Sequence, residues 1–187
     1  MREKLSTKGI KTSQKSLVTY PSSVDWPKSG VRMIFGGIWL VDAYLKWQPA
    51  FRAEYLDLLV SAAKDQPAWL SPWFQFWISL VSPRVPFFYF GTALIETCIA
   101  LALILGFARK LTYIFAIGFS LLIWSTAEGF GGPYTAGATD IGTGIIYALV
   151  FLTLLALNTQ TGTSKYSVDF LIEKRFPWWR KVAEVKI

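Results

Sequence analysis

The sequence predicts an all-α membrane protein: a four-transmembrane-helix bundle with both termini cytoplasmic and an exoplasmic interfacial helical connection between the first two helices. Three observations predict this class. Hydrophobic residues make up 53% of the 187 residues and charged residues only 17%, more apolar surface than a soluble domain easily covers. Four apolar stretches approach the ~20 residues that cross a bilayer. Lysine and arginine gather in a few segments, as membrane topology would place them.

The basic residues orient the chain. They concentrate in the N-terminal arm (1–29), in the short loop at Arg109 and Lys110, and in the C-terminal tail (158–187). Because cytoplasmic segments carry the excess of Lys and Arg, all three are expected in the cytoplasm. The net charge of +7 then reflects topology, and nucleic-acid binding is not expected. The polar start does not resemble a cleaved signal peptide, so the first span is expected to remain as an anchor.

The transmembrane domain (30–157) begins with a predicted span over residues 30–47 that carries charged residues. Asp42 and Lys46 are four residues apart, so they lie on one helix face and can pair. Trp39 extends that face inward. At ~1.5 Å per residue, Asp42 lies roughly 8 Å below the outer interface.

The connection 48–86 is expected outside and helical. An apolar helical rhythm is followed by a cluster of aromatic residues between prolines, which suits short helices in the interface or a re-entrant cap. Its apolar part is too short for a fifth span. Arg52 and Arg84 in this connection, together with Lys46, are the cations available to attract an anion from outside.

The second predicted span, 87–105, contains one charged residue, Glu96. A carboxylate at bilayer depth costs about 2.5–3.5 kcal/mol on insertion scales, and such residues usually handle protons, ions or a polar ligand. Glu96 is expected ~14 Å deep, close to the midplane. The structural alternative is a neutral acid hydrogen-bonded to a neighbouring helix. Cys98 lies on another face, where a buried structural role is expected.

The third span (111–127) and the fourth (141–157) flank a glycine-rich loop, 128–140. Clustered glycines let a backbone turn tightly and approach a ligand or another helix. Ser120, Trp124 and Glu128 recur at helical spacing toward the outer end of the third span. Asp140 precedes the fourth span and can cap its N-terminus, and Tyr147 follows on the same face.

All four spans therefore carry polar groups toward their exoplasmic halves. The simplest arrangement is a pocket that opens outward, has its floor near Glu96 and is rimmed by Asp42, Lys46, Glu128 and Asp140. The structural alternative keeps Asp42 and Lys46 as a local ion pair and the other two acids as ordinary interfacial ends. The tail mixes aromatic and basic residues and is expected to form an amphipathic surface helix.

The missing residue types narrow the chemistry. The chain has no His and only one Cys, so it is not expected to ligate a haem, an iron–sulfur cluster or a metal by itself. Any redox role needs a borrowed carrier, and in a bilayer the obvious carrier is a quinone.

The segment from Trp124 to Phe151, which includes AEGFGGPYTAGATDIGTGIIYALVF, resembles the DoxD-type subunit of thiosulfate:quinone oxidoreductase, within the broader DoxX-like family. The first span, GVRMIFGGIWLVDAYLKW, and the aromatic connection, WLSPWFQFWISLVSP, fit the same family. The resemblance covers about residues 30–157, and the glycine-rich loop is its most specific part.

The resemblance implies a multi-pass enzyme of the cell membrane that couples two thiosulfates into tetrathionate and passes two electrons to quinone. It implies a separate DoxA-type small subunit as partner, with a terminal quinol oxidase as a further candidate partner. Combined with the pocket, it assigns candidate roles to ten residues. These are Glu96, Asp42 and Lys46 for catalysis, Arg84, Arg52, Glu128 and Asp140 for substrate binding, and Trp39, Trp124 and Tyr147 for quinone binding.

Two alternatives remain open at this point. The chain can be a non-catalytic subunit of a terminal quinol oxidase or of another respiratory complex. It can also be a transporter of a sulfur anion that uses Glu96 as the coupling acid, although no clear inverted repeat is visible in the sequence.

Overall fold

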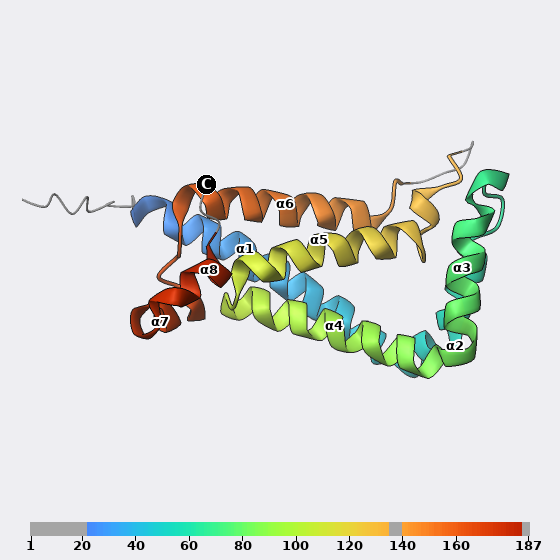
Figure 1. The fold of residues 1–187 in the computed structure, drawn as a ribbon, viewed down its shortest axis with the longest axis horizontal. Helices are drawn as coiled ribbons and strands as arrows, with labels where there is room; N and C mark the ends of the chain where they lie inside the picture. The colour runs from blue at the N-terminus through green and yellow to red at the C-terminus, as the bar shows by residue number, and fades with distance from the viewer. Residues whose placement is uncertain (1–21, 135–139, 185–187) are drawn as a thin grey trace, which may run out of the picture.

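The computed structural model describes residues 22–134 and 140–184, and within these ranges the chain is helical and contains no strand. The all-α prediction is confirmed. Four long helices run side by side along the longest axis of the molecule (Figure 1). They are α1 (Ser22–Lys46), α4 (Val85–Leu105), α5 (Arg109–Ser125) and α6 (Thr143–Thr161).

Two segments of the described chain are long and apolar enough to cross a membrane. One is Ala68–Leu105, whose second half is α4, and the other is Thr143–Gln160 in α6. The other two bundle helices are less uniform in composition or shorter: α1 carries charged residues toward both ends, and α5 has 17 residues.

The bundle core is aromatic. Helix α1 packs along α4, and α5 packs along α6. Phe35 and Trp39 of α1 meet Phe151 of α6 with ring centroids 4.9 and 5.3 Å apart, and Leu103 and Tyr113 complete the same cluster from α4 and α5. Edge-to-face contacts of this kind fix the relative rotation of the helices.

Two glycines bring paired helices close together. A Cβ at Gly36 would lie 2.9 Å from the Cβ of Leu103, so α1 and α4 approach backbone to side chain at this point. A Cβ at Gly144 would lie 2.6 Å from the backbone oxygen of Ser120, which marks the equivalent approach of α6 to α5. Small residues at helix contacts are typical of membrane bundles.

The predicted helical connection covers one end of the bundle. It contains α2 (Pro49–Ala62), η1 (Ala68–Leu70), α3 (Ser71–Val81) and η2 (Ser82–Arg84). Helix α3 runs across the bundle axis. The chain changes direction at η2 and then continues along the bundle as α4 (Figure 1).

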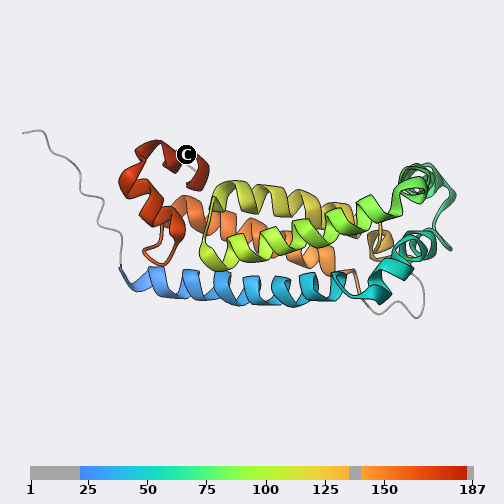
Figure 2. The same ribbon diagram turned by 90° about the horizontal axis from the view of Figure 1, so that it is seen from below.

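The tail differs from the single surface helix that was expected. It forms α7 (Val168–Arg175), η4 (Pro177–Trp179) and α8 (Arg180–Ala183), packed at the opposite end of the bundle from α3 (Figures 1 and 2). The start of α1 lies at this same end. The reason is Asp169, which is fully buried against the start of α5 and ties the tail to the bundle.

The helices also extend beyond the predicted span limits at residues 30 and 157. Helix α1 already begins at Ser22, and α6 continues to Thr161. The residues added at the start of α1 are largely polar, so hydropathy did not include them in the span. Two of them bond the end of α6 and the tail: Lys28 donates to the Gly162 oxygen, and Ser29 hydrogen-bonds Ser164.

The outward faces of the four bundle helices are apolar, and Cys98 lies among them, exposed. The expectation of a buried Cys98 was wrong, because Glu96 faces the interior and a residue two positions later points away from it. Large apolar side chains exposed on these faces include Ile34 and Val41 of α1, Phe87 and Leu101 of α4, Leu111 and Phe115 of α5, and Leu149 and Leu152 of α6.

Candidate functional site

A cavity of about 170 Å³ lies inside the bundle, in the half nearer α2 and α3. All four long helices contribute to it, and so do six of the ten predicted site residues. The cavity is lined by Trp39, Asp42, Lys46, Glu96, Ser120, Ile123, Glu128, Thr143, Gly144 and Tyr147.

Glu96 is a buried acid with an unsatisfied oxygen. Only 3% of the residue is exposed, and Oε2 has no hydrogen-bond partner among the described residues. The alternative of a neutral acid bonded to a neighbouring helix therefore has no such contact in the described chain. Because a buried polar atom without a partner costs about 1–3 kcal/mol, Glu96 is poised for a group inside the cavity.

Two more polar atoms of the cavity wall share this property. The Nε1 of Trp39 and the Oγ of Ser120 are buried and have no hydrogen-bond partner within the described ranges. An indole N–H is a donor, a hydroxyl donates and accepts, and a carboxyl can do either according to its protonation. The wall thus offers a mixed set of donors and acceptors to a polar ligand or to water.

Asp42 is held by α6. The hydroxyl of Tyr147 donates to Oδ2 of Asp42 at 2.9 Å, which links the first and last helices of the bundle above Glu96. The local ion pair that the spacing allowed is not formed: no contact within 4.0 Å joins Asp42 to Lys46 in the described chain. The Lys46 ammonium instead lies 4.8 Å from the ring centroid of Phe51.

Glu128 has a structural partner. Its two carboxylate oxygens accept from the Gly144 backbone N–H at 3.1 and 2.9 Å, at the start of α6, where the N-cap residue Gly142 supplies no side chain. An acid in this position satisfies an orphan N–H and complements the helix dipole. Burial raises the pKa of Glu128, and the Gly144 hydrogen bond opposes that shift.

Two residues of the glycine-rich region lie outside the cavity lining. Trp124 turns its Nε1 toward the Ile141 oxygen at 2.8 Å and packs its ring edge-to-face with Phe130, so it holds the loop rather than lining a slot. Asp140 is exposed and accepts from the Gly142 N–H at 2.7 Å, so its carboxylate is used within its own turn.

The two arginines are also separate from the cavity. Arg52 is exposed on α2 with its guanidinium 5.7 Å from the ring centroid of Tyr89, and Arg84 is exposed in η2. Both belong to the connection that covers the end of the bundle. Helical spacing along the spans could not place them, because their positions depend on how the connection folds.

Four cavity residues were missing from the predicted site: Ser120, Ile123, Thr143 and Gly144. Helical spacing already grouped Ser120, four residues before Trp124, with Trp124 and Glu128, but no role in the site was predicted for it. Gly144 is on the same helical stripe as Tyr147, but its close approach to α5 depends on how the two helices pack, which spacing along one helix does not reveal.

The charges of the cavity wall determine which ligands and reactions the cavity favours. Three carboxyl groups, those of Asp42, Glu96 and Glu128, face one ammonium group, that of Lys46. Such a wall favours proton transfer or a neutral hydrogen-bonding ligand over a dianion. Within the described ranges no cluster of three or more His, Cys, Asp or Glu side chains could hold a metal ion.

Comparison with known proteins gives no match: no family model, no curated protein and no solved structure matches this chain. The resemblance to the DoxD-type subunit therefore depends on the sequence segments quoted for it.

Proposed function

We propose that this chain is the quinone-binding, four-span membrane subunit of a thiosulfate:quinone oxidoreductase. The observation that carries the proposal is the buried Glu96, whose unpartnered oxygen shares a cavity with the unpartnered donors of Trp39 and Ser120. These groups suit the carbonyl oxygens of a quinone head group, which accept hydrogen bonds and take up protons when reduced.

The four-span part of the proposal is supported by the surface of the bundle. Apolar side chains are exposed along all four helices, a much larger apolar surface than a soluble monomer usually carries. The start of α1 and the tail lie at one end, as an even number of spans requires (Figure 2). The basic residues of that end suit the cytoplasmic side.

The proposed reaction balances over two electrons and two protons. Two thiosulfates lose one electron each and join through a new S–S bond as tetrathionate, and the quinone takes up both electrons and two protons. Glu96, when protonated, donates one proton to a quinone oxygen, is reprotonated, and then donates the second proton. The Tyr147 hydroxyl and Asp42, joined by a hydrogen bond, provide the proposed route for this reprotonation from the outer half of the bundle.

In this proposal thiosulfate is oxidised outside the cavity that binds the quinone. Because the cavity wall carries three acids, a dianion is more favourably attracted to the exposed Arg52 and Arg84 at the covered end of the bundle. A DoxA-type partner that docks at this end would complete the thiosulfate site.

The experiment measures reduction of a water-soluble quinone analogue by the purified chain, with and without the partner, in the presence of thiosulfate, with tetrathionate assayed in parallel. The proposal expects thiosulfate-dependent reduction with one tetrathionate formed per quinone reduced. Absence of reduction in both preparations, with folded protein and bound partner, would contradict it.

A second candidate is favoured by the separation of the arginines from the cavity. A chain with a quinone cavity but without cations beside it suits a quinone-handling subunit of another respiratory complex, whose partner performs all of the donor chemistry. Quinone binding without any thiosulfate dependence would favour this candidate. The acid-rich wall does not favour the sulfur-anion transporter.

A further inference from the structure

The C-terminal segment 162–184 turns its acidic side chains toward the bundle. On α7, Asp169 and Glu173 are four residues apart and lie on one face, with 0% and 8% of each residue exposed. A surface helix in water would show such residues to the solvent. This one shows Leu171, Lys174 and Arg175 instead.

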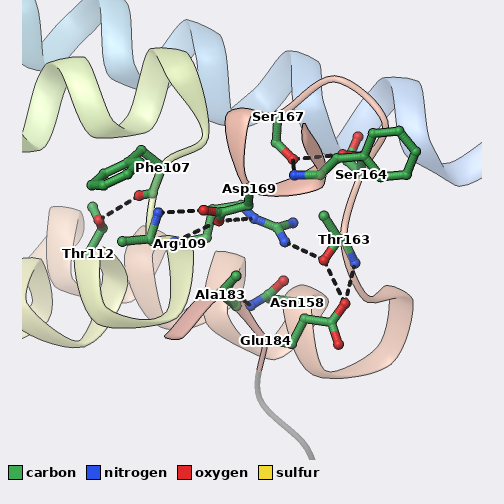
Figure 3. A network of polar contacts seen from close by, with 12 residues as sticks. Phe107, Arg109, Thr112, Asn158, Thr163, Ser164, Ser167, Asp169, Ala183 and Glu184 are labelled. Carbon is green, nitrogen blue, oxygen red and sulfur yellow. Dashed lines mark hydrogen bonds and ion pairs between the residues drawn. The ribbon is translucent and has the colours of Figure 1, made fainter. Parts of the chain in front are cut away.

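Asp169 is the centre of the contacts that hold this orientation (Figure 3). Its Oδ2 accepts from Nε of Arg109 at 2.9 Å, and its Oδ1 accepts from the Ala108 N–H at 2.7 Å and from Nε1 of Trp179 at 2.8 Å. The ion pair with Arg109 is buried on both sides, so it fixes α7 against the start of α5.

The other two acids of the segment are used in the same way. The Thr163 hydroxyl donates toward Glu173 at 2.6 Å. The Thr163 N–H donates to Glu184 at 3.1 Å (Figure 3). Glu173 also lies 3.6 Å from Arg180. All three acids of the segment are thus engaged in internal contacts.

The outward surface is therefore basic and apolar. Figure 2 shows α7 and α8 at the end of the bundle, on its α5 side. The exposed Phe107, between α4 and α5, packs against Trp179 with ring centroids 5.4 Å apart. Exposed residues of the segment are Lys165, Tyr166, Leu171, Lys174, Arg175, Phe176, Pro177, Trp178, Arg180 and Lys181.

We propose that this surface binds anionic phospholipid head groups of the bilayer that surrounds the bundle. Basic side chains complement the phosphate charge, while Leu171, Phe176 and Trp178 suit the head-group boundary beside them. The inference depends on the membrane-spanning part of the proposed function, and it does not depend on thiosulfate or quinone.

The test uses the full chain in lipid nanodiscs, with one environment-sensitive fluorophore on a cysteine introduced as Leu171→Cys in a Cys98→Ser background. Quenching of the label by acrylamide is compared between phosphatidylcholine discs and discs that also contain phosphatidylglycerol. The proposal expects quenching lower by about twofold or more in the anionic discs, and a loss of that difference at high salt.

Replacing exposed basic side chains tests the effect of charge without disturbing the fold. Lys165, Arg175 and Lys181 are exposed and make no side-chain hydrogen bond or ion pair within the described chain. The triple replacement Lys165→Gln, Arg175→Gln, Lys181→Gln is expected to remove the lipid dependence. Lys64→Gln, an exposed lysine at the opposite end of the molecule, is expected to retain it.

Each alternative result has a distinct meaning. A label that acrylamide quenches in both discs as strongly as the free fluorophore in solution, or a triple variant that behaves like the parent, overturns the lipid proposal. Equal protection in both discs shows docking by apolar side chains alone and overturns its charge-dependent part. A chain that does not stay with the discs overturns the membrane-spanning proposal itself, and this inference with it.

Discussion

At the scale of single residues, Glu96 is the group on which the proposed chemistry depends. Glu96→Gln keeps the shape and hydrogen-bonding capacity of the side chain but removes its ionisable proton. Thiosulfate-dependent quinone reduction is expected to fall by about 10²-fold or more, the usual contribution of a positioned acid. Glu54→Gln, an exposed acid on α2, is the matched control and is expected to leave turnover unchanged. Full activity of the Glu96 variant would remove the proton-donor role.

Glu173 predicts how the folding stability of the chain depends on pH. Burial raises its pKa above the ordinary value of 4.5, and Arg109 and Arg180 oppose the shift. The folded chain therefore binds this proton more tightly than the unfolded chain. The stability from Glu173 is fully present below pH 4.5 and is lost as pH rises through the raised pKa.

Thermal unfolding in detergent from about pH 4.5 to 7 checks this. Glu173→Gln keeps the acceptor for Thr163 and is expected to make the dependence of the midpoint on pH less steep over this range. Glu54→Gln is expected to keep the parent slope. Parallel curves for all three proteins would show that Glu173 does not titrate as the structure indicates.

Residue spacing was enough to place part of the site. Helical period grouped Asp42, Glu96 and Tyr147, because each lies within a regular helix, and all three line the cavity. It could not place Trp124, because its indole is turned by a hydrogen bond to Ile141 in a loop whose path is not periodic.

At the scale of helices, adjacent glycines of α1 provide a matched pair. Gly36 faces Leu103 of α4 at a distance that excludes a methyl group, whereas a Cβ at Gly37 would have no atom within 4 Å. Gly36→Ala is expected to destabilise the chain by about 1–3 kcal/mol through overpacking. Gly37→Ala is expected to be neutral or stabilising by up to about 1 kcal/mol.

Unfolding of both variants by denaturant in the same detergent compares them directly. Equal stabilities for the two would mean that α1 and α4 are not in close contact at Gly36.

The attachment of the tail makes a second prediction at this scale. Asp169→Ala leaves Arg109 buried without its partner, so a loss of about 3–5 kcal/mol is expected, together with release of α7 and α8 from the bundle. Asp57→Ala, an exposed acid on α2, is expected to have little effect. Limited proteolysis checks the release, and an Asp169 variant that is cut no faster than the control would contradict it.

The tail could not be predicted from its own sequence. Its mixture of aromatic and basic residues is typical of a surface helix, and that pattern does describe its outer side. Its inner side depends on Arg109, sixty residues earlier, which the charge pattern used only as a sign of topology. A buried ion pair between distant residues has no local signature.

At the scale of the whole molecule, the order of apolar and polar segments predicted the bundle and the helical connection, because both follow from the lengths and periods of continuous segments. The separation of two arginines from the cavity was not predictable in the same way. The sequence contained the cations Arg52 and Arg84, but only the folded connection separates them from the cavity.

The central claim is that the cavity around Glu96 receives a quinone head group. The most direct measurement is photolabelling of the purified chain with an azidoquinone, with the attachment sites located by mass spectrometry. Labelled residues are expected among Trp39, Ser120, Ile123 and Tyr147, and unlabelled quinone is expected to compete for the same sites. Labelling confined to the exposed outer faces of the bundle, without competition, would contradict it.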